Sequence, residues 1–95
     1  MNMSNELDQV VSQAAAVLKH FGAKEVYLFG SAATGTMREG SDVDMAVEGL
    51  PPAMFFGAMG RACQVLGRSL DLIDLDEPSP FTRYLKEQGK LIRVA

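Results

Sequence analysis

The sequence predicts an α/β (α+β) fold in which helices flank a small mixed β-sheet. Some stretches repeat apolar residues every three or four positions, as one side of a helix does. Others alternate apolar with polar residues, as half-buried strands do, and glycine and proline separate the stretches. Because the chain has 95 residues, 47% of them hydrophobic, we expect one domain over residues 1–95.

The expected elements alternate between helix and strand along the whole chain. We predict a helix over 5–21, a strand over 25–29, a small helix from about 31, a strand over 41–47, a helix over 53–66, a strand over 70–75, a helix over 80–88 and a short strand over 91–94.

Capping residues support the first helix, which has an apolar stripe at helical spacing. Ser4 is its expected N-cap, and Gly22 stands where a left-handed residue ends a helix. The stretch 25–29 reads as a short strand and ends at Gly30, which favours a tight turn after it.

The stretch 41–47 alternates, with Val43, Met45 and Val47 on one face. Asp42 and Asp44 occupy even positions together with Ala46, so both carboxylates are expected on one face of the strand.

The helix over 53–66 follows two prolines and is apolar nearly all round at its start, where Met54, Phe55 and Phe56 are consecutive. We expect these side chains to pack in the core. The alternative is a surface for a partner protein, to which methionine-rich faces are suited.

The last elements are predicted from a leucine- and isoleucine-rich strand over 70–75 and from Ser79 and Pro80, which suit the N-cap and first position of a helix. Gly89 is expected to close that helix.

Composition excludes several classes of protein. A net charge of −3 argues against direct nucleic-acid binding, which needs an excess of Lys and Arg. The single cysteine fits a reducing compartment, so we expect a cytoplasmic protein. No apolar run approaches the roughly 20 residues of a membrane span, so we expect no membrane association.

Gly30 and Ser31 follow a strand, where a small helix would present free N–H groups that bind phosphate well. Tight turns use the same two residues for conformational reasons alone, so this alternative stays open.

The carboxylates of Asp42 and Asp44 would repel one another on one face, and a divalent cation removes that conflict. Asp71 is a third acid inside an apolar strand, and Asp74 lies on that strand's opposite face. If the strands are neighbours, Asp71 completes a cluster that could ligate a metal and accept a proton. The alternative is a solvent-facing edge strand.

Gly30-Ser31, ten intervening residues and Asp42-x-Asp44 match the G-S-x10-D-x-D signature of the DNA-polymerase-β-like nucleotidyltransferase superfamily. The run LFGSAATGTMREGSDVDMAV resembles the minimal nucleotidyltransferases (MNT, MntA-like), which are antitoxin partners of HEPN-domain toxins. The likeness extends through the third acid in LDLIDLDEPSP to the C-terminal LIRVA. It implies the polymerase-β-like fold, a small mixed sheet with flanking helices.

The resemblance also implies roles for individual residues. Gly30 and Ser31 would hold the β- and γ-phosphates of ATP. Asp42, Asp44 and Asp71 would be the catalytic, metal-binding acids and hold two Mg²⁺ ions. The expected reaction is attack on the α-phosphorus, which leaves AMP on the acceptor and releases pyrophosphate.

Two basic residues of the family pattern are replaced here, since relatives have arginines where this chain has Ala32-Ala33-Thr34. Arg38 is the basic residue left between Gly30 and Asp44, and we assign it to nucleotide binding together with Ser41. A surface arginine on a loop is the alternative for Arg38.

In the resembled family, AMP is transferred to a tyrosine of the HEPN toxin, which implies a hetero-oligomer with that partner. Larger relatives carry a helical domain that holds the acceptor, and we expect another molecule to supply that surface here. Two alternatives remain. One is a non-catalytic antitoxin that blocks its partner by occlusion. The other is a small-molecule (antibiotic) nucleotidyltransferase that works with a separate helical subunit.

Overall fold

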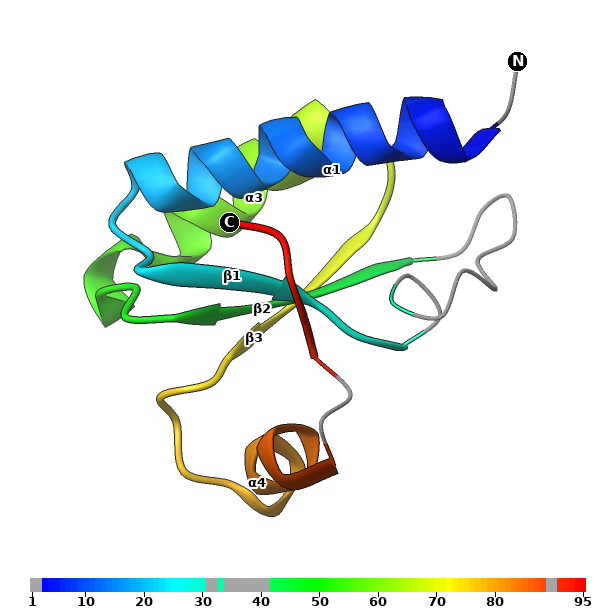
Figure 1. The fold of residues 1–95 in the computed structure, drawn as a ribbon. Coiled ribbons are helices and arrows are strands. Elements are labelled where there is room, and N and C mark those ends of the chain that lie inside the picture. The colour runs from blue at the N-terminus through cyan, green and yellow to red at the C-terminus, as the bar shows by residue number, and fades with distance from the viewer. Residues whose placement is uncertain (1–2, 31–32, 34–41, 89–90) are drawn as a thin grey trace.

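A computed structural model of the chain describes residues 3–30, 33, 42–88 and 91–95. Helices and strands alternate in it much as the sequence predicts (Figure 1). The elements are α1 (Met3–His20), β1 (Glu25–Leu28), β2 (Val43–Glu48), the 3-10 turn η1 (Pro52–Met54), α3 (Phe55–Leu66), β3 (Leu70–Asp74), α4 (Pro80–Gln88) and β4 (Ile92–Arg93).

The four described strands form one mixed sheet in the order β3-β2-β1-β4. β1 is antiparallel to both β2 and β4, whereas β2 and β3 are parallel. Parallel neighbours need a long crossover connection, which η1 and α3 provide. The predicted mixed sheet with flanking helices is confirmed.

One face of the sheet is covered by α1 and α3, and α4 lies on the opposite side (Figure 1). The main core fills the space under α1 and α3, because the odd-numbered residues of β2 point there. Its fully buried members include Leu18, Val26, Val43, Met45 and Val47.

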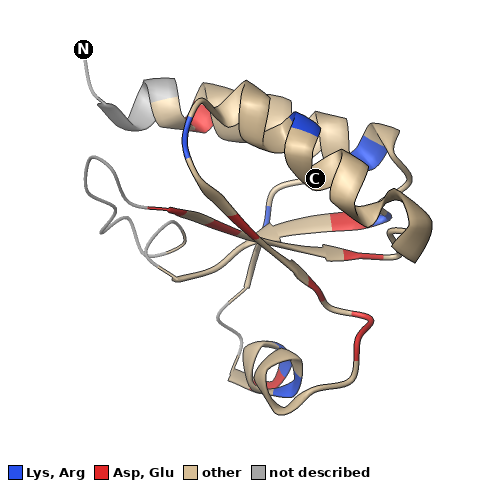
Figure 2. Cartoon of the chain, turned by 180° about the vertical axis from the view of Figure 1, so that it is seen from behind, with Lys and Arg blue, Asp and Glu red and all other residues tan. Residues whose placement is uncertain are grey.

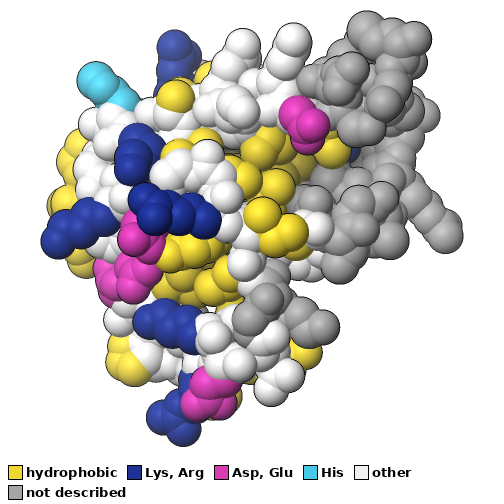
Figure 3. Space-filling view, viewed as in Figure 1, with side chains coloured by type: hydrophobic (Ala, Val, Ile, Leu, Met, Phe, Trp, Pro, Cys, Tyr) yellow, Lys and Arg dark blue, Asp and Glu magenta, His cyan; other side chains and the backbone are white. Residues whose placement is uncertain are grey.

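The other face has a smaller core under α4, formed by Phe29, Ala46, Leu75 and Leu85. Apolar side chains are visible between the sheet and α4 in the space-filling view (Figure 3). This second face also carries Asp44 and Asp71, so the smaller core borders the predicted acidic site.

Two local expectations are wrong. Ser4 lies within α1 and does not precede it as an N-cap. At the start of α3, Met54 and Phe56 are 40% and 76% exposed, so core packing does not hold for them. The buried residues of α3 follow one another at intervals of four and form a narrow stripe, Ala58, Ala62 and Leu66. A residue of the first turn that lies outside this stripe faces solvent.

A glycine with positive φ follows both α1 and α3. Gly67 adopts the left-handed conformation after α3, with φ of 69°, and donates its N–H to the Cys63 carbonyl. Gly22, after α1, has a φ of 120°. Within the described residues, no helix is long and apolar enough to cross a membrane.

Candidate active site

Asp44 and Asp71 lie side by side on neighbouring strands. They are paired positions in the parallel register of β2 and β3, and parallel strands are about 4.8 Å apart. The pairing of Met45 with Leu72 alternates with it, and both of these side chains are buried on the opposite face. The predicted neighbourhood of the two acids therefore follows from strand register.

Phe29, which directly follows β1, extends the same row. Its backbone N–H donates to the Asp44 carbonyl over 3.0 Å, continuing the antiparallel pairing of Leu28 with Met45. Phe29, Asp44 and Asp71 therefore lie in one row across this face of the sheet. We call it the carboxylate row after its two acids. Phe29 was predicted as a strand residue with no role in the site, although alternation from Glu25 and Tyr27 places it on this face.

Asp42 immediately precedes β2 and is exposed. It is two residues from Asp44, which corresponds to about 7 Å between Cα atoms in extended chain. Val43 between them is fully buried, and its N–H donates to the Ser69 carbonyl over 2.9 Å. Burial of Val43 on one face leaves both aspartates on the other.

Gly30 is placed directly against the Asp44 side chain. Its φ is +63°, a conformation that L-residues rarely adopt. A Cβ built there would collide with Oδ2 of Asp44 and lie 3.2 Å from its Cγ. Glycine is therefore needed at position 30 both for its conformation and for this close approach.

The surroundings of Asp44, the central residue of the row, oppose ionisation of its carboxyl group. Partial burial raises the pKa of Asp44, and the negative charges of Asp71 and Asp42 raise it further. Among the described residues, no cation forms an ion pair with these three acids, whereas Arg93 forms one with Glu25. Acidic positions recur along the strands, whereas most Lys and Arg positions lie on the helices and connections (Figure 2).

The donor set suits a hard divalent cation, because carboxylate oxygens are ligands that Mg²⁺ prefers. Across residues 3–30, 33, 42–88 and 91–95, however, no three His, Cys, Asp or Glu side chains are arranged to hold a metal by themselves. Mg²⁺ commonly takes one or two carboxylates and completes its shell with substrate phosphates and water. The pair Asp44 and Asp71 matches that mode of binding.

The structure thus brings together Gly30, Asp42, Asp44 and Asp71. The other predicted nucleotide-binding residues, Ser31, Arg38 and Ser41, lie outside the described residues, as do Ala32 and Thr34 of the substituted stretch.

Two clefts elsewhere contain none of these acids. One, of about 720 Å³, is lined by residues within 75–88, which are α4 and the connection before it. The other, of about 370 Å³, lies at the opposite end of β1 and β2 and is lined by Lys24, Glu25, Glu48, Gly49 and Asp76. We rank the carboxylate row above both as a candidate site, because Asp44 and Asp71 are paired acids to which the described part of the chain offers no cationic partner.

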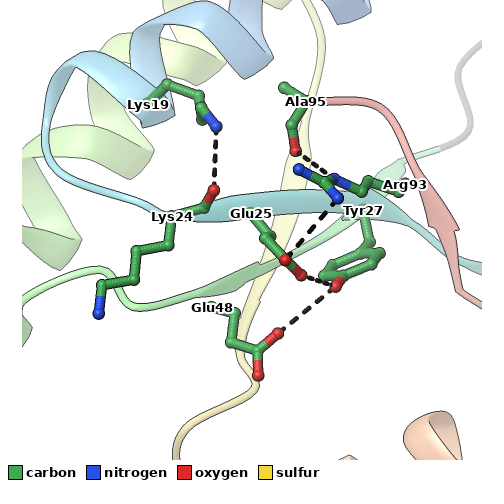
Figure 4. Close-up of polar contacts among 7 residues, drawn as sticks. All are labelled: Lys19, Lys24, Glu25, Tyr27, Glu48, Arg93 and Ala95. Atoms are coloured by element: carbon green, nitrogen blue, oxygen red, sulfur yellow. Dashed lines mark hydrogen bonds and ion pairs between the residues drawn. The ribbon is translucent and has the colours of Figure 1, made fainter.

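Near the second cleft, the acids have partners (Figure 4). The Tyr27 hydroxyl donates to Oε2 of Glu25, and Oε2 of Glu48 is 3.4 Å away. Arg93 Nη1 is 3.8 Å from the Glu25 carboxylate. The Tyr27 bond and the Arg93 charge lower the pKa of Glu25, while the same bond and burial raise the pKa of Tyr27 to about 12.

Comparison with known proteins identifies relatives of the chain. A sequence model of the nucleotidyltransferase domain matches residues 11–94. No curated protein sequence matches the chain.

Among solved structures, the chain is similar to a protein described as a minimal nucleotidyltransferase, with a TM-score of 0.70, 24% identity and 94% of each chain covered. It is similar to a chain of a toxin–antitoxin crystallised with AMP-PNP, with a TM-score of 0.69, 22% identity, and coverage of 90% of this chain and 70% of that one. A third is a chain in the complex of a tri-AMPylated Shewanella oneidensis HEPN toxin with its MNT antitoxin. There the TM-score is 0.64, the identity 21% and the coverage 90% and 70%. At such identities the likeness shows the fold, and it confirms the predicted polymerase-β-like architecture.

Proposed function

Since the chain belongs to the family of nucleotidyltransferase domains, we propose that it is a Mg²⁺-dependent enzyme that transfers AMP from ATP to a tyrosine hydroxyl of a HEPN-domain toxin, as that toxin's antitoxin. The observation that carries this proposal is the pairing of Asp44 with Asp71, with the backbone of Gly30 against the Asp44 carboxylate. A purely structural sheet has no need of two adjacent acids without cationic partners.

In this mechanism, Gly30 and Ser31 bind the β- and γ-phosphates of ATP, assisted by Arg38 and Ser41. Asp42, Asp44 and Asp71 would hold two Mg²⁺ ions, which supply neutralisation of charge on the triphosphate and the attacking oxygen. Asp71 accepts the proton of the acceptor hydroxyl. The hydroxyl oxygen bonds to the α-phosphorus while the bond to the β-phosphate oxygen breaks, and pyrophosphate leaves.

The partner is proposed from the neighbours, since one is a complex of an MNT antitoxin with an AMPylated HEPN toxin. The exposed Met54 and Phe56 support a protein contact of this chain, as exposed large apolar side chains often mark interfaces. We take residues 1–95 as one catalytic domain that works in a hetero-oligomer, in the cytoplasm.

A second candidate is an antitoxin that neutralises its partner by occlusion, without catalysis. The same exposed side chains favour it, because binding alone requires a surface and no carboxylate row. In the first candidate the acids of the carboxylate row are needed for catalysis, whereas in the second they are not needed for neutralisation.

The test uses [α-³²P]ATP, Mg²⁺, this chain and a HEPN-domain toxin as acceptor. We expect label on the toxin, lost with Asp71→Asn and with mutation of the modified tyrosine. Asp74→Asn is the matched control, because Asp74 is on the same strand with its side chain on the opposite face, where Oδ1 accepts the Asp76 N–H over 2.9 Å. Asp74→Asn should label the toxin at the wild-type rate.

Each outcome decides between the candidates. If Asp71→Asn neutralises the toxin as well as the wild type does, and the wild type transfers no label, the protein acts by occlusion and not by catalysis. Label found on a hydroxylated antibiotic and not on the toxin would establish the small-molecule alternative.

A further inference from the structure

An exposed aromatic ring stands beside the carboxylate row. Phe81, in the first turn of α4, is 46% exposed. Its ring packs edge-on against Phe29, with centroids 5.9 Å apart and planes at 69°. Phe29 itself is buried, so the aromatic pair has one covered ring and one ring that is open to solvent.

Phe29 links this open ring to the site. It directly follows β1 and continues the pairing with β2 opposite Asp44, and side chains directly opposite on antiparallel strands have Cβ atoms about 5 Å apart. Phe81 therefore packs against the residue that neighbours Asp44 in the row. The helix that carries it, α4, lies on the side of the sheet opposite α1 and α3 (Figure 1), which is the side of both paired acids.

The ring is held in place by a capped helix start. Ser79 Oγ accepts the N–H of Thr82 over 3.1 Å, and Thr82 Oγ1 donates to the Glu77 carbonyl over 2.8 Å. Thr82 and Leu85 are buried against the second core, which fixes the side of α4 that faces the sheet. The half-exposed position of Phe81 is thus set by the fold and not by a mobile end of the chain.

We propose that the exposed face of Phe81 is the stacking platform for the nucleobase of the nucleoside triphosphate whose phosphates bind at Gly30, Asp44 and Asp71. This rests on the proposed function. A nucleotide with its α-phosphate at the acids must place its base beyond the sugar, next to the row, and Phe81 is an open aromatic surface there. Stacking uses the π-face that every base has, so it needs no polar group to read the base edges.

Stacking predicts a preference between classes of base. Purines present a larger ring system than pyrimidines, so ATP and GTP should bind more tightly than CTP and UTP. Replacement of the ring should remove the preference, because sequence preferences on aromatic platforms arise from stacking strength.

The chain has no tryptophan, which permits a direct optical test. Phe81→Trp would install the only indole, and we expect ATP with Mg²⁺ to quench its fluorescence, while tripolyphosphate, which has no base, does not. Phe56→Trp is the matched control. Phe56 is 76% exposed at the start of α3, which follows the far end of β2, and its indole should respond to neither probe.

Affinity provides the second measurement, by calorimetry with the same two probes. Phe81→Ala and Phe81→Leu should weaken ATP binding about 5- to 150-fold and leave tripolyphosphate binding unchanged, and Phe81→Tyr should restore ATP binding. Leucine keeps apolar cover over Phe29, so a loss with both variants is not a folding defect, which thermal unfolding checks.

The result that overturns this inference is unchanged ATP affinity in Phe81→Leu, or an equal loss for ATP and tripolyphosphate. In that case Asp44→Asn still separates failure of this inference from failure of the proposed function. If it abolishes Mg²⁺-dependent ATP binding, the proposed function survives and the stacking platform alone is wrong. A wild-type chain that binds no ATP would refute both.

Discussion

The two ends of one face of the sheet place acidic side chains in opposite electrostatic environments. At one end, Asp44 is flanked by further acids and by an aromatic ring, and its pKa is raised. At the other, Glu25 accepts a hydrogen bond from Tyr27 and faces Arg93, and its pKa is lowered (Figure 4). Both residues lie on strands of the same face, one at each end.

The difference separates acids that stabilise the fold from acids that are kept for a ligand. Glu25 and Glu48 have their partners within the chain, so their charges are compensated without any bound molecule. The carboxylate row has no described partner, and its repulsion is a cost that a bound cation removes.

Asp44→Asn should have the largest effect on activity, a loss of about a hundredfold or more in the rate of nucleotidyl transfer. Replacement of groups that only support a metal ligand already costs 10- to 100-fold. Steady-state transfer of labelled AMP measures it. Glu48→Gln, on the same strand and face at the other end, is the control and should retain full activity. Equal losses in the two variants would show that the ends do not differ in role.

Gly30→Ala should lower transfer activity, though less than Asp44→Asn does, and should also lower stability, because the new Cβ collides with the Asp44 carboxylate and the backbone has φ of +63°. The left-handed conformation alone costs roughly 1–2 kcal/mol for a residue with a Cβ.

Gly67→Ala isolates that backbone cost, since Gly67 has φ of +69° and nothing lies within 4 Å of the position of a Cβ. It should be destabilised by about 1–2 kcal/mol in urea unfolding while transfer activity stays normal. If Gly30→Ala behaves like Gly67→Ala in both assays, close packing against Asp44 is not needed for function.

Stability should depend on pH in opposite senses at the two ends. The folded chain binds a proton at Asp44 more tightly than the unfolded chain, so stability falls as pH rises from the ordinary value of 3.8 through the raised pKa. Asp44→Asn should therefore raise the melting temperature at pH 7 and not at pH 3. Glu25 has a lowered pKa, so its stabilisation is present above its ordinary value of 4.5 and is lost as pH falls through the folded pKa.

Bound Mg²⁺ should offset the repulsion between the acids of the carboxylate row. Added Mg²⁺ is expected to raise the melting temperature of the wild type more at pH 7 than at pH 4, where protons compete, and EDTA should remove the increase. Asp44→Asn should not respond. A similar response from Asp44→Asn would locate the cation elsewhere.

The smallest effect concerns Tyr27. Its absorbance titration, taken as the difference between wild type and Tyr27→Phe, should have a midpoint of about 12, because ionisation must break the bond to Glu25. Glu25→Gln should lower that midpoint toward 10 and leave AMP transfer unchanged. An unchanged midpoint would contradict the Tyr27–Glu25 contact.

Alternation within strands was readable from the sequence, and it placed Asp42 and Asp44 on one face and Asp71 opposite Asp74. Which strands are neighbours, and in what register, depends on packing between distant segments. The pairing of Asp44 with Asp71 therefore required the structure. The same holds for Phe81, whose contact with Phe29 joins residues 52 positions apart along the chain.

The error at the start of α3 has a related cause. Met54, Phe55 and Phe56 are all apolar, so periodicity does not indicate which of them faces the core. The stripe of Ala58, Ala62 and Leu66 decides it and leaves Phe56 exposed. The N-cap expectation at Ser4 failed because residue type alone fixes helix ends only to within a few residues.

The connection between α3 and β3 has a consequence for how this protein can vary. Only residues 67–69 separate the two elements, and the Ser69 carbonyl accepts the Val43 N–H that starts the pairing of β2 with β3. Loss of one residue there would slide β3 by one position, turn Asp71 into the apolar core and bring Leu72 to the surface. Every acid would still be present, yet no pair would form. Insertions and deletions in this loop are therefore as damaging to the site as replacement of an aspartate, although no loop residue belongs to the carboxylate row.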